Sequence, residues 1–146
     1  MSNTISNLVD MDYANTFSKK AAMVLAFNQG KILAVSRKND KTKFGLAGGK
    51  VDDGETYLQA AIRECYEETG LEAFCPIPVF SRMEPGDIDF FAIVYLVQWK
   101  GEIHKTSDKE TGVVKWCTWE ELEEGPFGDY NKALHQHLIN IGLLDE

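Results

Sequence analysis

Three glutamates in the middle of the chain stand at spacings that could build a metal site. Glu64, Glu67 and Glu68 occupy positions i, i+3 and i+4, so a helix would point their carboxylates into one arc of roughly 100°. Like charges at these spacings repel and destabilise an isolated helix, which indicates that a cation balances them. Mg²⁺ takes oxygen ligands and usually binds through carboxylates together with substrate phosphates. The spacing therefore predicts metal-assisted chemistry at phosphorus.

The segment around these glutamates resembles the signature of the Nudix hydrolases. That signature runs Gly, five residues, Glu, seven residues, Arg-Glu, an apolar residue, any residue, Glu-Glu, any residue, Gly and an apolar residue. The fixed positions are all met within residues 49–71, by Gly49, Glu55, Arg63, Glu64, Glu67, Glu68 and Gly70. Cys65 and Leu71 fill the two apolar positions, and cysteine is small enough to be buried there.

The resemblance implies a fold, a reaction and a cofactor. The fold would be the Nudix-type α/β/α sandwich, an α/β fold with a mixed β-sheet. The reaction would be hydrolysis of the diphosphate linkage in a nucleoside diphosphate that carries another moiety. Two or three Mg²⁺ ions, which Mn²⁺ can replace, would lower the pKa of a bound water and neutralise charge on the phosphoryl oxygens.

The resemblance also implies a set of metal ligands. These would be the carbonyl of Gly48, just before the signature, and the carboxylates of Glu55, Glu64, Glu67, Glu68 and Glu110. Arg63 would belong to the catalytic residues as an organiser. It would pair with Glu55 and fix the geometry of the loop and the helix rather than contact the substrate.

The general base stays open among three glutamates. In this family the base is either a glutamate of the signature or a carboxylate of a later loop, so Glu67, Glu68 and Glu110 are all candidates. Glu110 lies in a polar segment six residues before Trp116. Asp108 and Glu102 are its rivals for the role of the later carboxylate.

Three other residues are candidates for contacts with the substrate. Nudix enzymes often place an arginine after the second strand for the substrate phosphates, which here is Arg37. Lys50 would either touch phosphate or stay solvated. Phe44 would stack on a base, although packing in the core is the stronger interpretation.

The substrate is less well defined than the reaction. Residues 44–50 read F-G-L-A-G-G-K and are similar to the Pro-Gly-Gly-Lys segment of MutT-like nucleoside triphosphate hydrolases, with Ala47 in place of proline. ADP-ribose hydrolases often carry a proline about 15 residues after the signature, and Pro85 lies 14 residues after Leu71. ADP-ribose, dinucleotides and nucleotide sugars therefore remain alternatives. A non-catalytic nucleotide-binding Nudix module is a third reading, but its usual mark is a degraded signature.

Length and composition predict one domain over residues 1–146, with residues 1–18 as a polar N-terminal extension. A net charge of −8 argues against a general nucleic-acid binder, and no apolar run is long enough to span a membrane. Cys65, Cys75 and Cys117 predict free thiols in a reducing cytoplasm. We expect a small nucleotide as the partner and a monomer or homodimer.

Local patterns predict the elements that must position these residues. Strands are expected at 21–27 and 31–36 as a hairpin, at 44–47, at 74–83 and 90–99 as an antiparallel pair, and at 113–118. Capping boxes at Thr56 with Gln59 and at Thr118 with Glu121 predict two helices. The first should end at Gly70, and a last helix over 130–141 should be capped by Asp129.

Overall fold

A computed structural model of the protein describes residues 9–104 and 112–145. The chain divides into two compact units, each built around its own sheet. Unit 1 comprises Met1–Ala26 with Ala47–His104, and unit 2 comprises Phe27–Leu46 with Lys105–Glu146. The expectation of a single domain stays a prediction.

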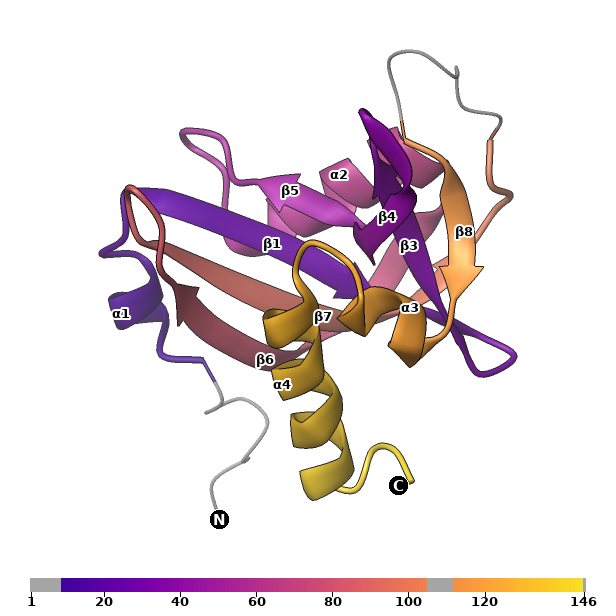
Figure 1. The fold of residues 1–146 in the computed structure, drawn as a ribbon. Helices are drawn as coiled ribbons and strands as arrows, with labels where there is room; N and C mark the ends of the chain where they lie inside the picture. The colour runs from indigo at the N-terminus through magenta and orange to yellow at the C-terminus, as the bar shows by residue number, and fades with distance from the viewer. Residues whose placement is uncertain (1–8, 105–111, 146) are drawn as a thin grey trace. The chain divides into compact units, whose positions relative to one another are not determined.

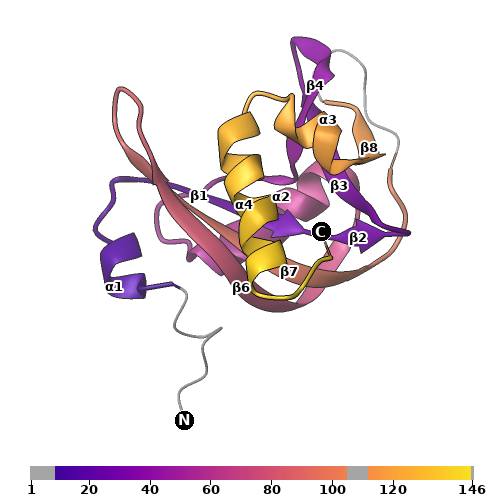
Figure 2. The same cartoon turned by 60° about the horizontal axis from the view of Figure 1, so that its bottom comes forward.

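Unit 1 contains a mixed four-stranded sheet in the order β5-β1-β7-β6. The strands are β1 (Lys19–Leu25), β5 (Gly48–Lys50), β6 (Glu72–Glu84) and β7 (Phe90–Lys100). β1 runs parallel to β7, whereas β1 with β5 and β6 with β7 are antiparallel. The long antiparallel pair of β6 and β7 is visible in Figures 1 and 2. The predicted α/β class with a mixed sheet and the predicted pairing of residues 74–83 with 90–99 are confirmed.

One face of this sheet is covered by α2 (Tyr57–Thr69). The helix buries Tyr57, Ala60, Ala61, Cys65 and Thr69. The Tyr57 ring meets the ring of Phe91 on β7 edge-on, with centroids 6.4 Å apart. Because side chains alternate across a strand, this contact shows that Phe91 and the residues paired with it lie on the face covered by α2.

A short helix in unit 1 lies within the segment expected to be a polar extension. This helix, α1 (Met11–Ala14), begins at Asp10, whose carboxylate accepts a hydrogen bond from the Tyr13 amide. The hydroxyl of Tyr57 donates to the Ala14 carbonyl. Sequence analysis did not predict α1, because four residues are too few for a periodic pattern.

Unit 2 contains four strands and two helices among its described residues. They are β2 (Phe27–Asn28), β3 (Lys31–Arg37), β4 (Asp40–Leu46), β8 (Val114–Cys117), α3 (Trp119–Glu123) and α4 (Gly128–Asn140). β3 pairs antiparallel with β2, β4 and β8, so it organises the sheet. The strand predicted over residues 113–118 and the helix predicted from the second capping box are confirmed.

Three local predictions were wrong. The strand predicted over residues 21–27 is divided between β1 and β2. Only β2 forms a hairpin with β3, because β1 pairs with β5 and β7 instead. The strand expected over 44–47 is longer, because it is the end of β4, which begins at Asp40, and a separate short strand, β5, begins at Gly48. Asp129 does not cap α4, since the N-cap position is Phe127 and Asp129 lies in the first turn.

The cysteines agree with the expected free thiols. Cys65 and Cys117 are buried and Cys75 is exposed, and none forms a disulfide. In the part of the chain that the structure describes, no helix combines the length and the apolar character needed to cross a bilayer.

Candidate functional site

Helix α2 holds the three glutamates, and both of its ends are fixed by local hydrogen bonds. At the N-terminus the Thr56 side chain accepts from the Gln59 amide at 3.0 Å, and the Gln59 side chain accepts from the Thr56 amide at 2.9 Å. At the C-terminus Gly70 adopts a left-handed conformation with φ of 86°, which a residue with a side chain adopts only at a cost. The predicted start and end of the helix are therefore confirmed.

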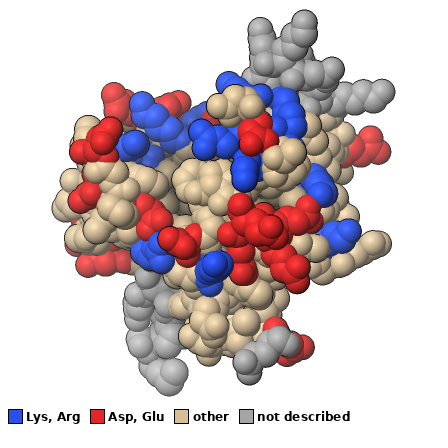
Figure 3. Space-filling view, viewed as in Figure 1, with Lys and Arg blue, Asp and Glu red and all other residues tan. Residues whose placement is uncertain are grey.

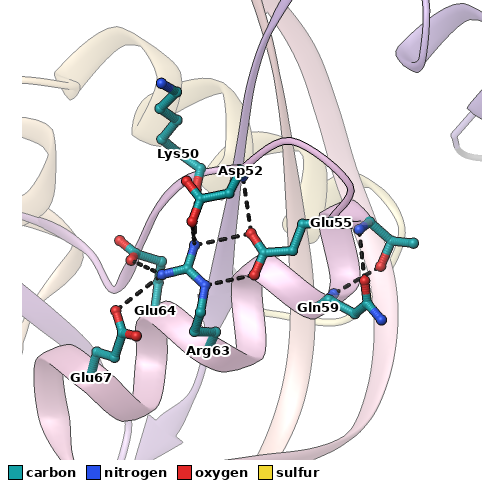
Figure 4. A network of polar contacts seen from close by, with 8 residues as sticks. Lys50, Asp52, Glu55, Gln59, Arg63, Glu64 and Glu67 are labelled. Carbon is teal, nitrogen blue, oxygen red and sulfur yellow. Dashed lines mark hydrogen bonds and ion pairs between the residues drawn. The ribbon is translucent and has the colours of Figure 1, made fainter.

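Arg63 lies at the centre of a network of carboxylates (Figure 4). Its Nε donates to Glu55 Oε2 at 2.6 Å and its Nη2 donates to Glu55 Oε1 at 3.0 Å, so the predicted pair is present and bidentate. Its Nη1 donates to Glu64 Oε1 at 2.6 Å and to Glu67 Oε1 at 3.0 Å. One guanidinium therefore holds the loop glutamate and two helix glutamates together.

Sequence analysis did not predict that Asp52 or the backbone carbonyl of Lys50 belongs to this network. Arg63 Nη2 lies 3.3 Å from Asp52 Oδ2 and donates to the Lys50 carbonyl oxygen at 3.3 Å. The amide of Asp52 donates to Glu55 Oε1 at 3.0 Å. The three-residue spacing of Asp52 and Glu55 in a glycine-containing loop was the available signal, because such loops close through side-chain to backbone bonds.

Glu68 is held by the strand that precedes the loop. Its Oε1 accepts a hydrogen bond from the Gly48 amide at 2.8 Å, so the structure brings together two of the residues predicted to bind metal. A Cβ added at Gly49 would lie only 2.0 Å from Glu64 Oε2. The absence of a side chain at residue 49 is therefore what makes room for the Glu64 carboxylate.

The surroundings of Glu55 and Glu64 shift their pKa values in opposite directions. Hydrogen bonds from Arg63 and from the Asp52 amide lower the pKa of Glu55 to about 2. Burial raises the pKa of Glu64, and the nearby Glu67 carboxylate raises it further, while Arg63 opposes both effects. An added cation would lower the pKa of Glu64, because a nearby positive charge favours the ionised carboxylate.

The donor atoms of α2 fit a hard divalent cation. All the side-chain oxygens offered by Glu64, Glu67 and Glu68 belong to carboxylates, the ligands that Mg²⁺ prefers. The Glu64 carboxylate occupies the space where a side chain at residue 49 would lie. Within residues 9–104 and 112–145, no three His, Cys, Asp or Glu side chains already converge as ligands. Arg63 Nη1 bridges Glu64 and Glu67 instead.

The remaining predicted site residues are placed as follows. Glu110 and its rival Asp108 lie outside the described residues, and Glu102 is exposed in unit 1. Lys50 is exposed, and Figure 4 shows its side chain directed away from Arg63.

Arg37 and Phe44 belong to unit 2. Arg37 is exposed and lines an open cavity of about 440 Å³ together with Asn39, Asp40, Lys43, Glu124, Gly125 and Pro126. Phe44 is only 8% exposed, and the Lys115 ammonium lies 5.3 Å from the centre of its ring. Its burial favours the packing role over base stacking.

The surface charge is mixed rather than basic. Figure 3 shows both acidic and basic side chains on the face that it draws, with many of the acidic ones gathered in one patch. The net charge of −8 means that acidic side chains outnumber basic ones over the whole sequence.

Comparison with known proteins matches the NUDIX domain model to residues 17–138. A putative 8-oxo-dGTP diphosphatase of Bacillus subtilis is 37% identical over 54 residues, which are 37% of this chain and 36% of the relative. An ADP-ribose pyrophosphatase of Methanocaldococcus jannaschii is 54% identical over 43 residues, 28% of this chain and 25% of the relative. The chain thus matches only about a third and a quarter of the length of these two relatives. A CTP pyrophosphohydrolase of Escherichia coli is 34% identical over 102 residues, 66% of this chain and 73% of the relative.

Solved structures show the same fold. A MutT NUDIX hydrolase from Burkholderia pseudomallei aligns with a TM-score of 0.68 and 24% identity, covering 81% of this chain and 96% of that one. The E. coli ORF135 protein aligns with a TM-score of 0.70 and 23% identity, covering 90% and 98%. Together with the domain match and the intact signature on α2, these similarities show that the chain belongs to the NUDIX family.

Proposed function

We propose that this chain is a divalent-metal-dependent pyrophosphohydrolase that cleaves the diphosphate linkage of a nucleotide. The observation that carries the proposal is the Arg63 network, in which one guanidinium joins the loop residue Glu55 to Glu64 and Glu67 of α2. Clustered carboxylates repel an anionic diphosphate unless cations lie between them. The site therefore suits a metal–diphosphate complex.

The residues of unit 1 divide the work of this reaction. Glu64, Glu67 and Glu68, with the carbonyl of Gly48, would hold Mg²⁺ or Mn²⁺. The bound metal supplies charge neutralisation at the phosphoryl oxygens and a more acidic water. The Glu67 side chain is 56% exposed, more than those of Glu55 and Glu64, so Glu67 is a candidate to accept a proton from water, together with Glu68 and Glu110. Arg63 and Glu55 would fix the orientation of the ligands.

A nucleoside triphosphate is the proposed substrate, with a nucleoside monophosphate and pyrophosphate as products. Support comes from residues 44–50 and from the CTP pyrophosphohydrolase and 8-oxo-dGTP diphosphatase names of two relatives. ADP-ribose is the second candidate, because the stretch shared with the M. jannaschii ADP-ribose pyrophosphatase is 54% identical. A small nucleotide as the partner, the cytoplasm as the location and a monomeric or homodimeric state are parts of the same proposal.

A substrate panel with and without metal tests the proposal. Purified protein would be assayed with nucleoside triphosphates, ADP-ribose, dinucleoside polyphosphates and nucleotide sugars in Mg²⁺, and pyrophosphate and phosphate release would be measured. We expect turnover of triphosphates that disappears in EDTA and returns when Mg²⁺ or Mn²⁺ is added. Full turnover by metal-stripped protein in EDTA would overturn the metal-dependent mechanism.

Glu67→Gln provides the matched variant. It keeps the shape of the side chain and should lower kcat by about 10²-fold or more, since loss of a metal ligand or base removes several kcal/mol of transition-state stabilisation. The melting temperature should stay close to that of the wild type, because the lost ion pair with Arg63 is largely exposed. An unchanged kcat would show that this helix face is not the reaction site. An inactive but folded wild type would favour the non-catalytic binding module.

A further inference from the structure

An ion pair on β6 lies apart from the Arg63 network and has no role in the reaction described so far. Arg82 Nε donates to Glu84 Oε2 at 2.8 Å, and Arg82 Nη2 donates to Glu84 Oε1 at 3.2 Å. The Glu84 side chain is 15% exposed and that of Arg82 is 38% exposed. The pair is therefore bidentate, and both of its side chains keep some exposure to solvent.

The pairing register places Arg82 on the face of the unit 1 sheet away from α2. Phe91, which contacts Tyr57 of α2, lies next to Ala92 on β7. Adjacent side chains on a strand point to opposite faces, so Ala92 belongs to the other face. Arg82 pairs with Ala92, and Glu84 lies two residues on, so both members of the ion pair share that face.

The same register joins the pair to the site in a single row of residues. Arg82 pairs with Ala92, Ala92 with Ala21, and Ala21 with Lys50. Lys50 belongs to the strand whose Gly48 amide binds Glu68, and its carbonyl binds Arg63. Two alanines thus separate the Arg82 end of the row from the Lys50 end. Three strand spacings amount to about 14 Å, a length comparable with that of an extended nucleotide.

The charge of the pair decides which part of a nucleotide it suits. A guanidinium whose charge is already neutralised by a bidentate carboxylate is a weak partner for phosphate. Phosphate binds best to cations whose positive charge is not already balanced. It is a good partner for a base, because an arginine–carboxylate pair offers N–H donors beside carboxylate acceptors. Half-buried aromatic side chains, Phe80 two residues before Arg82 and Phe90 opposite Glu84, lie on the same face.

We propose that the Arg82–Glu84 pair binds the base of the substrate nucleotide and selects guanine. Guanine carries the O6 and N7 acceptors that arginine recognises most often, and its amino group is a donor for a carboxylate. The diphosphate then lies toward Lys50 and the Arg63 network. This inference rests on the proposed pyrophosphohydrolase function and names the substrate class within it.

Steady-state kinetics on the full chain with four nucleoside triphosphates test the selection. In the wild type, kcat/KM for GTP should exceed that for CTP, ATP and UTP. Arg82→Met should lower kcat/KM for GTP by about 10- to 100-fold, mainly through KM, and should change the value for CTP by less than about threefold. Glu84→Gln should also reduce the preference for GTP while retaining most of the side-chain shape.

Lys100→Met is the matched control. It removes an ion pair that joins β6 to β7, in which Lys100 Nζ lies 3.6 Å from Glu72 Oε2. Its kcat/KM values should stay within about twofold of the wild type for all four nucleotides. Equal use of all bases by the wild type, or an equal loss for every base in Arg82→Met, would overturn the proposal.

Binding measurements keep this proposal separate from the proposed function. If the wild type hydrolyses no nucleotide, calorimetry with GMP and CMP in the absence of metal decides the matter. Tighter binding of GMP that is lost in Arg82→Met would support the base site although the hydrolase function had failed. Absent or equal binding of the two monophosphates would overturn the base site.

Discussion

At the scale of single residues, Arg63 is the organising group of the candidate site. It contacts carboxylates that precede it in the loop and carboxylates that follow it on the helix. Part of the like-charge repulsion predicted for the helix is therefore relieved within the protein itself. A cation that binds here would compete with the guanidinium for the Glu64 and Glu67 oxygens.

Gly49→Ala should reduce activity with little loss of stability. The new Cβ would lie 2.0 Å from Glu64 Oε2, and a carboxylate at the end of a flexible side chain can move away. A displacement of about 1 Å in a reacting site can cost about 10²-fold in rate. We expect kcat to fall by about that factor while the melting temperature changes by only a few degrees.

Gly45→Ala is the control for this substitution. Its added Cβ would meet only Phe127 of unit 2, at an ordinary contact distance of 3.5 Å. Its kcat should stay near the wild-type value. Wild-type kcat in Gly49→Ala would show that the position of the Glu64 carboxylate does not matter for turnover.

Glu55 should give the fold a measurable acid sensitivity. Its pKa is about 2 in the folded protein and about 4.3 in an unfolded chain. Its contribution to stability is therefore complete above about pH 4.3 and is lost as the pH falls toward 2. In urea titrations, the stability difference between the wild type and Glu55→Gln should shrink over that range. A difference that stays constant from pH 6 to pH 2.5 would contradict the assignment.

The placement of Glu64, Glu67 and Glu68 on one helix could be predicted, because their spacing and the capping box at Thr56 are local features of the sequence. The Arg82–Glu84 pair could not be singled out, because its meaning depends on the row that links it through Ala92 and Ala21 to Lys50. That row joins strands far apart in the sequence. The role of Glu110 stays a prediction.

At the scale of elements, two helices with the same capping box permit a direct comparison. Thr56 and Thr118 each accept a hydrogen bond from the amide three residues later. Thr56→Ala and Thr118→Ala should each cost about 1 kcal/mol of stability in urea unfolding. Only Thr56→Ala should also lower kcat, because α2 carries the glutamates. Equal effects of the two variants on kcat would indicate that the start of α2 does not position the site.

The elements that were predicted correctly are those defined by neighbouring residues. Both capping boxes and the turn at Gln29-Gly30 depend on residues within a few positions of each other. The partner of β1 could not be read in this way. The apolar run over residues 21–27 is continuous, and nothing in it marks the change from the β1 sheet to the β2 sheet after Leu25.

At the scale of the whole molecule, the two units are interleaved along the chain. The sequence passes from one unit to the other at residues 26–27, 46–47 and 104–105. Neither unit is a continuous segment, so cutting the chain at any one point cannot release an intact unit.

We therefore expect a single cooperative unfolding transition. Heat unfolding followed by calorimetry and by tryptophan fluorescence should give coincident curves. Mg²⁺ together with a non-hydrolysed nucleotide analogue should raise the melting temperature, because a ligand that binds only the folded state stabilises it. Two separate transitions would contradict the expectation of one domain over residues 1–146.

The parallel pairing of β1 with β7 has a consequence for folding during synthesis on the ribosome. Each residue of β1 waits for a partner that is made 71 residues later, as Lys19 does for Phe90. At a synthesis rate of 5–20 residues per second, this interval lasts roughly 4 to 14 s. During that time the edge of β1 that β7 will occupy stays open, because β5 pairs with the opposite edge, and β1 carries Val24 and Leu25, which are fully buried in the folded protein. A nascent chain stalled before residue 90 therefore exposes an unpaired strand edge that other chains can bind. Until β7 emerges, it depends on chaperones to prevent aggregation.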